Sequence, residues 1–318
     1  MNIPYEETAA IVVLPAISGA RLKDPVLRRW LARANLTQAT EQKELLSGIL
    51  STLNLPTPES GLGALRMWGQ TGDRPTVWVA AADPVYLEPR LDHLCLHSLA
   101  DERAPASDLR PLFDHLQETL ADNANYGFAR VGSCGYLHAT DPIATAGMPS
   151  HVVHGQMPND YMPCGDDAGG YRSLMSEVEM SLHDHEVNLR RQEHGLQPVN
   201  CLWFWGGGFA PEQQTEPHPP LFSNDPLLKG YWLSRTGMVA AWPGNIAECL
   251  EASVAGFVAV TPAKDDPELL ERCLLELRDA LNSGRLSRLT LKFCDGIEAV
   301  VERSHAWHVW RRSMGLLD

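Results

Sequence analysis

Apolar residues recur at helical spacing in two segments, and these give the clearest secondary-structure signals in the chain. The first segment begins at Ser107, and the second begins at Asp265–Asp266–Pro267 and stops before Gly284. An acidic residue followed by proline favours a helix start, and glycine favours a helix end. Each segment is therefore predicted to form a helix with one apolar face. These faces comprise Leu109, Leu112, Phe113, Leu116 and Leu120 in the first, and Leu269, Leu270, Cys273, Leu274, Leu277 and Leu281 in the second.

Short apolar segments between the helical ones predict strands. Residues 288–301 alternate apolar and polar positions around Asp295–Gly296, the strongest hairpin signal in the sequence, so we expect an antiparallel pair there. Strands that alternate with helices, plus one hairpin, predict a three-layer α/β fold with a mixed sheet. Other strands are expected at 9–14, 76–82, 93–97, 127–139 (two), 199–205, 238–242 and 256–261, and other helices from 24, at 40–53, 172–195, 227–235 and 246–255, and around Trp307 and Trp310.

We expect one α/β domain over residues 1–318, although this length also permits two modest domains. Residues 140–170 are rich in Pro, Gly, Met and Asp and have weak periodicity. A long connection of this kind is typical of an irregular, lid-like segment over a surface. A disordered linker is the alternative.

Charge and cysteine content restrict the class of protein. The net charge is −14, which argues against a nucleic-acid partner but leaves room for a small anionic ligand in a local cationic pocket. No apolar run is long enough to span a bilayer, and the first residues lack a secretory pattern, so a cytoplasmic protein is predicted. The seven cysteines are widely spaced without a CxxC motif, which favours isolated buried thiols over disulfides or a zinc ribbon.

The segment 172–208 holds the densest group of candidate binding residues. A polar helix carrying His185, Asn188 and Arg191 is followed by a glycine stop and a buried-type strand, and then by three glycines, 206–208. In α/β sheets, ligands collect at the carboxyl ends of strands. Asn188 and Arg191 share a helical face, so with the glycine amides they favour an anion cradle, or alternatively they brace the helix against the strand. Asp83, at another predicted strand end, either orients a ligand or caps a turn.

The same segment carries a resemblance to a known family. The order His185–x–Val187–Asn188–x–x–Arg191, Pro198–x–Asn200 and Trp205–Gly206–x–Gly208 resembles the archaeal-type cofactor-independent phosphoglycerate mutases of the alkaline phosphatase superfamily, over about 171–240. With Ala82–Asp83–Pro84–Val85 and Met162–Pro163–Cys164–Gly165, residues 76–245 are more similar to a bacterial group named either as RpfE-type regulatory proteins or as cofactor-independent phosphoglycerate mutases. This resemblance implies an alkaline-phosphatase-like fold and ligand binding by Asp83, His185, Asn188, Arg191, Asn200, Gly206, Gly207 and Gly208.

The superfamily's catalysis requires two metal ions held by Asp and His residues. Three segments that carry these ligands in the mutases hold none at matching positions here, namely 12–16, 257–266 and the region of the 295–296 turn. We therefore predict no catalytic metal and no cofactor, and a regulatory protein that binds a small anion or a partner. A working mutase or phosphohydrolase is one alternative, with candidate ligands Asp83, Asp265, Asp266, Asp295, His305 and His308. A protein-interaction module with an exposed apolar patch is the other.

Overall fold

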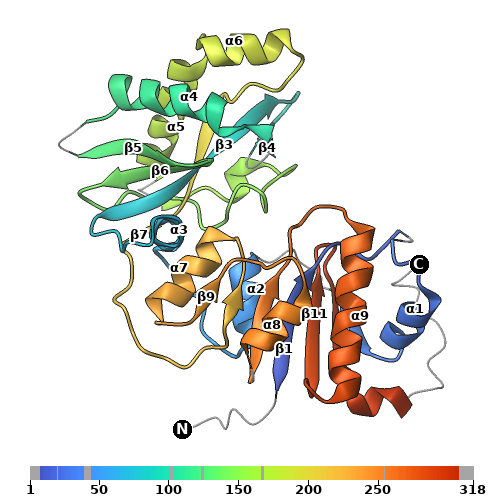
Figure 1. Ribbon diagram of the computed structural model, residues 1–318. Helices are drawn as coiled ribbons and strands as arrows, with labels where there is room; N and C mark the ends of the chain where they lie inside the picture. The colour runs from blue at the N-terminus through green and yellow to red at the C-terminus, as the bar shows by residue number, and fades with distance from the viewer. Residues whose placement is uncertain are drawn as a thin grey trace. The chain divides into compact units, whose positions relative to one another are not determined.

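The apolar helix after Asp266 and the hairpin around Asp295–Gly296 form as predicted in the computed structural model (Figure 1). Helix α9 spans Pro267–Ser283, with Asp266 capping the Leu269 amide and Gly284 following in a left-handed conformation. Strands β11 (Arg288–Phe293) and β12 (Ile297–Glu302) pair antiparallel around the 295–296 turn. The structure describes residues 8–19, 21–38, 44–99, 103–122, 125–165, 168–253 and 255–307.

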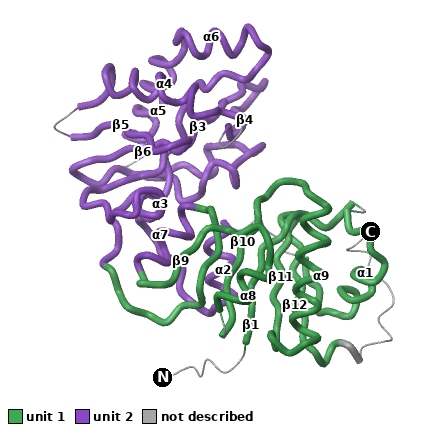
Figure 2. Tube along the Cα trace, in the orientation of Figure 1, with its two compact units in different colours: residues 1–42, 213–225, 235–318 green, residues 43–212, 226–234 purple. Residues whose placement is uncertain are grey.

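The chain divides into two compact units, where the sequence analysis expects one domain (Figure 2). Unit 1 comprises residues 1–42, 213–225 and 235–318, and unit 2 comprises residues 43–212 and 226–234. Each unit has its own sheet, and both contain helices, which confirms the mixed α/β class. The strands of the unit 2 sheet form one continuous block along the sequence, and this block is inserted between strands of the unit 1 sheet. None of the described helices is long and apolar enough to cross a membrane.

Unit 1 is built on a seven-stranded sheet in the order β2-β12-β11-β1-β10-β8-β9. Strand β1 pairs parallel with β10 and β11, and β12 pairs antiparallel with β11 and β2. Buried residues of the central strands and of α1 and α9 form one core, which includes Val12, Leu27, Leu274 and Leu289. The other strands of unit 1 are β1 (Ala9–Leu14), β2 (Asn35–Gln38), β8 (Leu221–Phe222), β9 (Val239–Ala240) and β10 (Gly256–Val260), and its other helices are α1 (Pro25–Leu31), α8 (Ile246–Ala252) and the 3-10 helix η4 (Arg303–Trp307).

Unit 2 contains a five-stranded antiparallel sheet in the order β4-β3-β6-β5, with β7 paired to β3. Helices α4 and α5 pack against this sheet, and α3 packs closely on α7. The strands are β3 (Trp78–Pro89), β4 (Leu94–Ser98), β5 (Tyr126–Val131), β6 (Cys134–Ala139) and β7 (Cys201–Gly208), and the helices are α2 (Leu45–Thr52), α3 (Leu62–Thr71), α4 (Ala106–Thr119), α5 (Ala168–Leu182), α6 (Glu186–Glu193), α7 (Pro226–Ser234) and the 3-10 helix η2 (Pro158–Asp160).

Two of the differences from the sequence expectation have a clear local cause. Strand β3 continues through Asp83–Pro84, where we expected it to stop. Proline has no backbone N–H to donate. Pro84 lies between the residues of β3 that pair with β6 and those that pair with β4, so neither pairing requires a hydrogen bond from it. The helix expected over 172–195 is instead two helices, because His185 adopts an extended conformation and accepts a hydrogen bond from the Val187 amide as the N-cap of α6.

The segment expected to be lid-like is irregular except for η2 in its described part, 140–165. It is joined to the sheet of unit 2 by backbone hydrogen bonds. Gly155 and Gln156 exchange bonds with Leu96 of β4, and Ala146 bonds to Phe204 of β7. The segment is thus a connection that follows the sheet over much of its length.

Candidate functional site

The carboxyl edge of the sheet in unit 1 is the first place to look for chemistry. The parallel strands β1, β10 and β11 end together there, and each is followed by a loop. In open α/β sheets, ligands bind at this edge. The loops contribute Ser18, Arg21, Asp265 and Asp295.

The two carboxylates at this edge already have partners from the chain. Oδ2 of Asp295 accepts hydrogen bonds from the backbone amides of Ile17 (2.9 Å) and Ser18 (2.7 Å). Arg21 makes a bidentate pair with Asp265, with Nε–Oδ1 at 2.7 Å and Nη2–Oδ2 at 3.1 Å, and its Nη1 donates to the Ser18 carbonyl. The hydrogen bond from Arg21 lowers the pKa of Asp265, and the hydrogen bond and charge of Asp265 raise the pKa of Arg21, with a smaller contribution from Asp295. One guanidinium thus offsets the charge of Asp265, while Oδ1 of Asp295 is buried without a hydrogen-bond partner among the described residues.

The other residues named for a working metalloenzyme are scattered. Asp266 caps α9, and His305 accepts a hydrogen bond from the Glu302 amide beside η4. Asp83 belongs to unit 2 and pairs with Arg66, and His308 lies outside the described residues. In the part of the chain that the structure describes, none of these acids and imidazoles belongs to a group with metal-ligand spacing.

A cavity of about 250 Å³ lies in unit 1 between α1, α9, β12 and η4. Helices α1 and α9 start after the carboxyl ends of β1 and β10, so their last turns lie at the opposite, amino edge of the sheet. Neither Arg21 nor Asp265 belongs to the lining of this cavity. Four arginines, one tryptophan and one carboxylate are prominent in its lining, namely Arg29, Arg33, Arg278, Arg303, Trp30 and Glu302.

The arginines of this cavity are held in different ways. Arg303 donates from Nε to the Leu281 carbonyl (2.7 Å) and from Nη2 to the Asn282 carbonyl (2.8 Å), which satisfies the end of α9. Arg29 donates to a carbonyl within α1. Arg278 makes no hydrogen bond or ion pair with any described residue. A concave site with this excess of guanidinium groups is suited to an anion, because guanidinium binds carboxylate and phosphate through paired N–H groups. The sequence analysis missed the cavity, because its arginines come from three separated segments.

Asn188 and Arg191, predicted to cradle an anion, have the contacts of the bracing alternative. The Asn188 side chain is buried, and its Nδ2 donates to the carbonyls of Leu182 and Val199 while its Oδ1 accepts from the Val199 amide, each at 2.9 Å. Arg191 is also buried. Its guanidinium donates to Asp108 and to the carbonyls of Arg103 and Gln197 at 2.7–2.8 Å.

His185 and Asn200 likewise have partners in the backbone. His185 caps α6 with its Nδ1, and burial together with the neighbouring His115 ring lowers its pKa. Asn200 exchanges two hydrogen bonds with the backbone of Leu87, at 2.8 and 3.0 Å, and so extends the pairing between β7 and β3.

The three glycines of β7 permit close packing. The Gly206 amide donates to Ala146, and the Gly207 carbonyl accepts from the Gly61 amide at the start of α3. A Cβ at Gly208 would lie 2.4 Å from the Gly61 nitrogen, so only glycine lets the two backbones approach this closely. These positions fix α3 on the sheet.

Asp83 lies in a buried network at the centre of unit 2. Its Oδ1 pairs with Arg66 Nη1 at 2.6 Å, and its Oδ2 accepts from the Ser150 hydroxyl (2.9 Å) and from Trp205 Nε1 (2.7 Å). Burial alone would raise the pKa of Asp83, but the charge and hydrogen bond of Arg66 lower it overall. The Arg66 guanidinium also lies 4.9 Å from the Tyr136 ring centroid. The eight predicted binding residues therefore all contact the protein itself.

Sequence comparison relates part of the chain to one group of enzymes. It is 37% identical over 67 residues to the 2,3-bisphosphoglycerate-independent phosphoglycerate mutase of Methanosarcina acetivorans, a match that covers 21% of this chain and 17% of that one. It is 36% identical over 135 residues to the probable enzyme of the same name from Geobacter sulfurreducens, covering 41% and 33%. The matches thus span a third or less of these relatives.

Comparison of structures identifies a similar fold. The PH0037 protein from Pyrococcus horikoshii superposes with a TM-score of 0.53 at 13% identity, over 93% of this chain and 87% of that one. No family model matches the sequence.

Proposed function

We propose that this chain is a phosphoglycerate-mutase-like protein that binds a small phosphorylated anion in the arginine cavity of unit 1 and does not turn it over. The partial sequence similarity to phosphoglycerate mutases supports a phosphorylated three-carbon acid as the class of ligand. In this proposal the protein has a regulatory role of the RpfE type, in which ligand binding rather than catalysis is the output.

The arginine cavity is the observation that carries the proposal. The chain has a net charge of −14, yet four arginines and only one carboxylate meet in a space of about 250 Å³. An excess of guanidinium groups on one concave surface attracts an anion, because opposite charges attract. Phosphate and carboxylate groups match the N–H geometry of arginine, and Trp30 offers an apolar wall.

The proposal that turnover is absent depends on the carboxyl edge. Asp265 and Asp295 hold Arg21 and two backbone amides there. A dinuclear centre for phosphoryl transfer needs several carboxylates and imidazoles around two cations. Among the described residues, Asp265 and Asp295 belong to no group of acids and imidazoles with metal-ligand spacing, so we expect this edge to be inactive in transfer.

Titration calorimetry with 3-phosphoglycerate and with inorganic pyrophosphate tests the binding. We expect saturable binding that Arg278→Ala weakens at least about tenfold, because a hydrogen bond to a charged group contributes about 1.5–3 kcal/mol. Arg278 has no described partner, so its loss should leave folding unchanged. Arg272→Ala, at an exposed position of the same helix outside the cavity lining, is the matched control and should bind as the parent does.

Two results would overturn the proposal. Absence of binding, or equal weakening by Arg272→Ala and Arg278→Ala, removes the cavity as the site. Mutase or phosphatase turnover in the presence of Mn²⁺ that is abolished by Asp265→Asn would show that the carboxyl edge is catalytic.

A further inference from the structure

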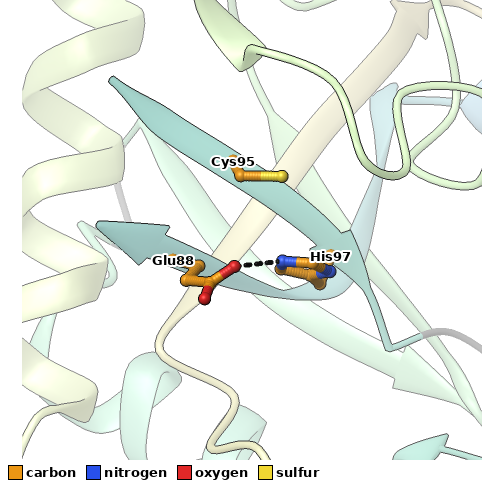
Figure 3. A group of neighbouring side chains, drawn as sticks. All are labelled: Glu88, Cys95 and His97. Atoms are coloured by element: carbon orange, nitrogen blue, oxygen red, sulfur yellow. Dashed lines mark hydrogen bonds and ion pairs between the residues drawn. The ribbon is translucent and has the colours of Figure 1, made fainter. Parts of the chain in front are cut away.

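The hairpin of β3 and β4 in unit 2 places three different metal-binding side chains on one face. In the antiparallel register, Glu88 lies directly opposite Cys95, and His97 follows Cys95 by two positions. Residues two apart on a strand point to the same side, and directly opposed residues have neighbouring Cβ atoms. Figure 3 shows the three side chains gathered in this way.

The donor atoms are close enough to share one ion. The Cys95 sulfur, one ring nitrogen of His97 and one carboxylate oxygen of Glu88 all lie within 4.8 Å of one another. His97 Nε2 already points at Glu88 Oε2, at 2.8 Å. Cys95 is buried, whereas His97 and Glu88 are half-buried, so the group has a protein side and an open side.

We propose that Glu88, Cys95 and His97 form a binding site for one Zn²⁺-class cation. Thiolate, imidazole and carboxylate together are the ligand set of zinc, and three protein ligands leave a fourth, open position for water. Binding displaces the proton of the Cys95 thiol, which passes to solvent as the Cys95 sulfur–metal bond forms. This inference is independent of the arginine cavity, which lies in unit 1.

The surroundings of the trio support ligand positions that are set in advance. Arg90 donates from Nε and Nη2 to Glu88 Oε2 at 3.0 and 2.7 Å, the same oxygen that faces His97, so Oε1 remains available to an ion. Hydrogen bonds of this kind orient a metal-bound carboxylate. The His97 ring stacks on Tyr86 and meets the edge of His154, which restricts its rotation.

His154 itself is excluded as the fourth ligand. Its Nδ1 accepts a hydrogen bond from the Ser98 amide at 3.0 Å, so the neutral ring carries its proton on Nε2. The fourth position is therefore left to solvent.

No local sequence motif marks this site, because the ligands come from two strands joined by their pairing. The expectation that the cysteines are isolated buried thiols rests on spacing along the chain alone. Cross-strand register supplies the proximity that a CxxC motif would otherwise provide.

Cobalt binding followed by visible and near-ultraviolet absorption tests the site, because Co²⁺ replaces Zn²⁺ and a cobalt–thiolate bond absorbs characteristically. The full chain, reduced and freed of metal, should bind one Co²⁺ with a thiolate band and release one proton. Zn²⁺ should displace the Co²⁺ and remain at one ion per chain after dialysis. Cys95→Ser should abolish the band, and His97→Gln should weaken binding at least about tenfold.

Cys164→Ser is the matched control, because this thiol is exposed and does not belong to the trio. It should keep the band and the stoichiometry. If Cys95→Ser fails to fold, Glu88→Gln tests the site instead. This variant retains the thiol and should still weaken Co²⁺ binding at least about tenfold. A parent protein without the band, a band that survives in Cys95→Ser, or unchanged affinity in both His97→Gln and Glu88→Gln would refute the site.

Discussion

Replacing Asp83 by asparagine is the most direct test of how unit 2 is held together. The side chains of Asp83 and Arg66 are only 6% and 9% exposed, and their charged atoms lie 2.6 Å apart. Asparagine keeps the size of aspartate and can still accept from Ser150 and Trp205, but it removes the negative charge. The substitution therefore isolates the charge of Arg66 in a buried environment.

The expected cost follows from this burial. Removing one partner of a buried ion pair destabilises a protein by about 3–5 kcal/mol, because the remaining charge is left uncompensated. Arg66 Nε is already buried without a hydrogen-bond partner among the described residues, so loss of the Asp83 charge leaves the guanidinium with few interactions that offset its burial. We expect Asp83→Asn to lower the free energy of unfolding of unit 2 by an amount in this range, a large part of the stability of an ordinary domain.

Urea unfolding and hydrogen exchange measured on peptides from β3 and β7 provide the readout, since exchange separates unit 2 from unit 1. The control is Asp265→Asn, which breaks the Arg21 pair. Its side chains are 61% and 33% exposed, so solvent screens the interaction and we expect little change in stability. A loss below about 1 kcal/mol for Asp83→Asn, or similar effects of the two variants, would contradict the assignment of a strong buried pair.

The same pair predicts an acid dependence. The pKa of Asp83 is lowered in the folded protein, whereas the pKa of an aspartate in an unfolded chain is about 3.9. The ionised form therefore stabilises the fold fully above that unfolded value, and the contribution is lost as pH falls through the folded pKa. Asp83→Asn should remove this part of the acid sensitivity, so the two proteins should converge in stability as the pH is lowered below 4. Parallel curves for parent and variant would be inconsistent with a lowered pKa.

Two further substitutions test the packing of unit 2. Asn188→Ala should destabilise unit 2 by about 3 kcal/mol, because the substitution leaves buried backbone groups such as those of Val199 unpaired. The affinity for pyrophosphate should not change. Denaturant unfolding and calorimetry measure the two effects. Gly230→Ala should lower the melting temperature, at a cost of about 1–3 kcal/mol or more, because a Cβ there overlaps the Leu65 carbonyl oxygen. The control Gly48→Ala, with open space around its Cβ in helix α2, should raise the melting temperature slightly. Equal shifts in the two variants would refute close contact between α3 and α7.

The elements best predicted from the sequence are those whose pattern is local. The apolar stripe of α9, its Asp266 cap and its Gly284 end lie within one segment, and the 295–296 turn fixes the pairing of β11 with β12. In these cases spacing and capping agree, so periodicity alone places the elements to within a few residues.

The errors arise where tertiary contacts override local signals. Pro84 normally ends a strand, yet β3 passes through it because two different partners flank that position. One helix is expected through His185, but its ring caps α6 instead. Helix α3 was not anticipated, since its two ends, at Gly61 and Gly72, carry left-handed glycines rather than a capping side chain.

The candidate sites depend still more on long-range contacts. Arg29 and Arg303 are separated by most of the chain, and only the packing of α1 against α9 and η4 places them around one cavity. Asn188 and Arg191 are expected to share a helical face, but spacing cannot distinguish a ligand from the backbone of Val199 and the carboxylate of Asp108 as their partners.

The placement of charge within unit 1 bears directly on catalysis. In two-metal phosphoryl transfer, the cations must contact the same phosphate that the nucleophile attacks, so acids, metals and phosphate share one place. Here Asp265 and Asp295 lie at the carboxyl edge, whereas the arginine cavity lies where α1 and α9 end, at the amino edge. Strand β1 separates these edges by six residues, which corresponds to roughly 17 Å at about 3.3 Å per residue. The cavity lining includes neither Asp265 nor Asp295, so we expect a phosphate bound there as proposed to lack contact with these carboxylates, in keeping with binding without transfer.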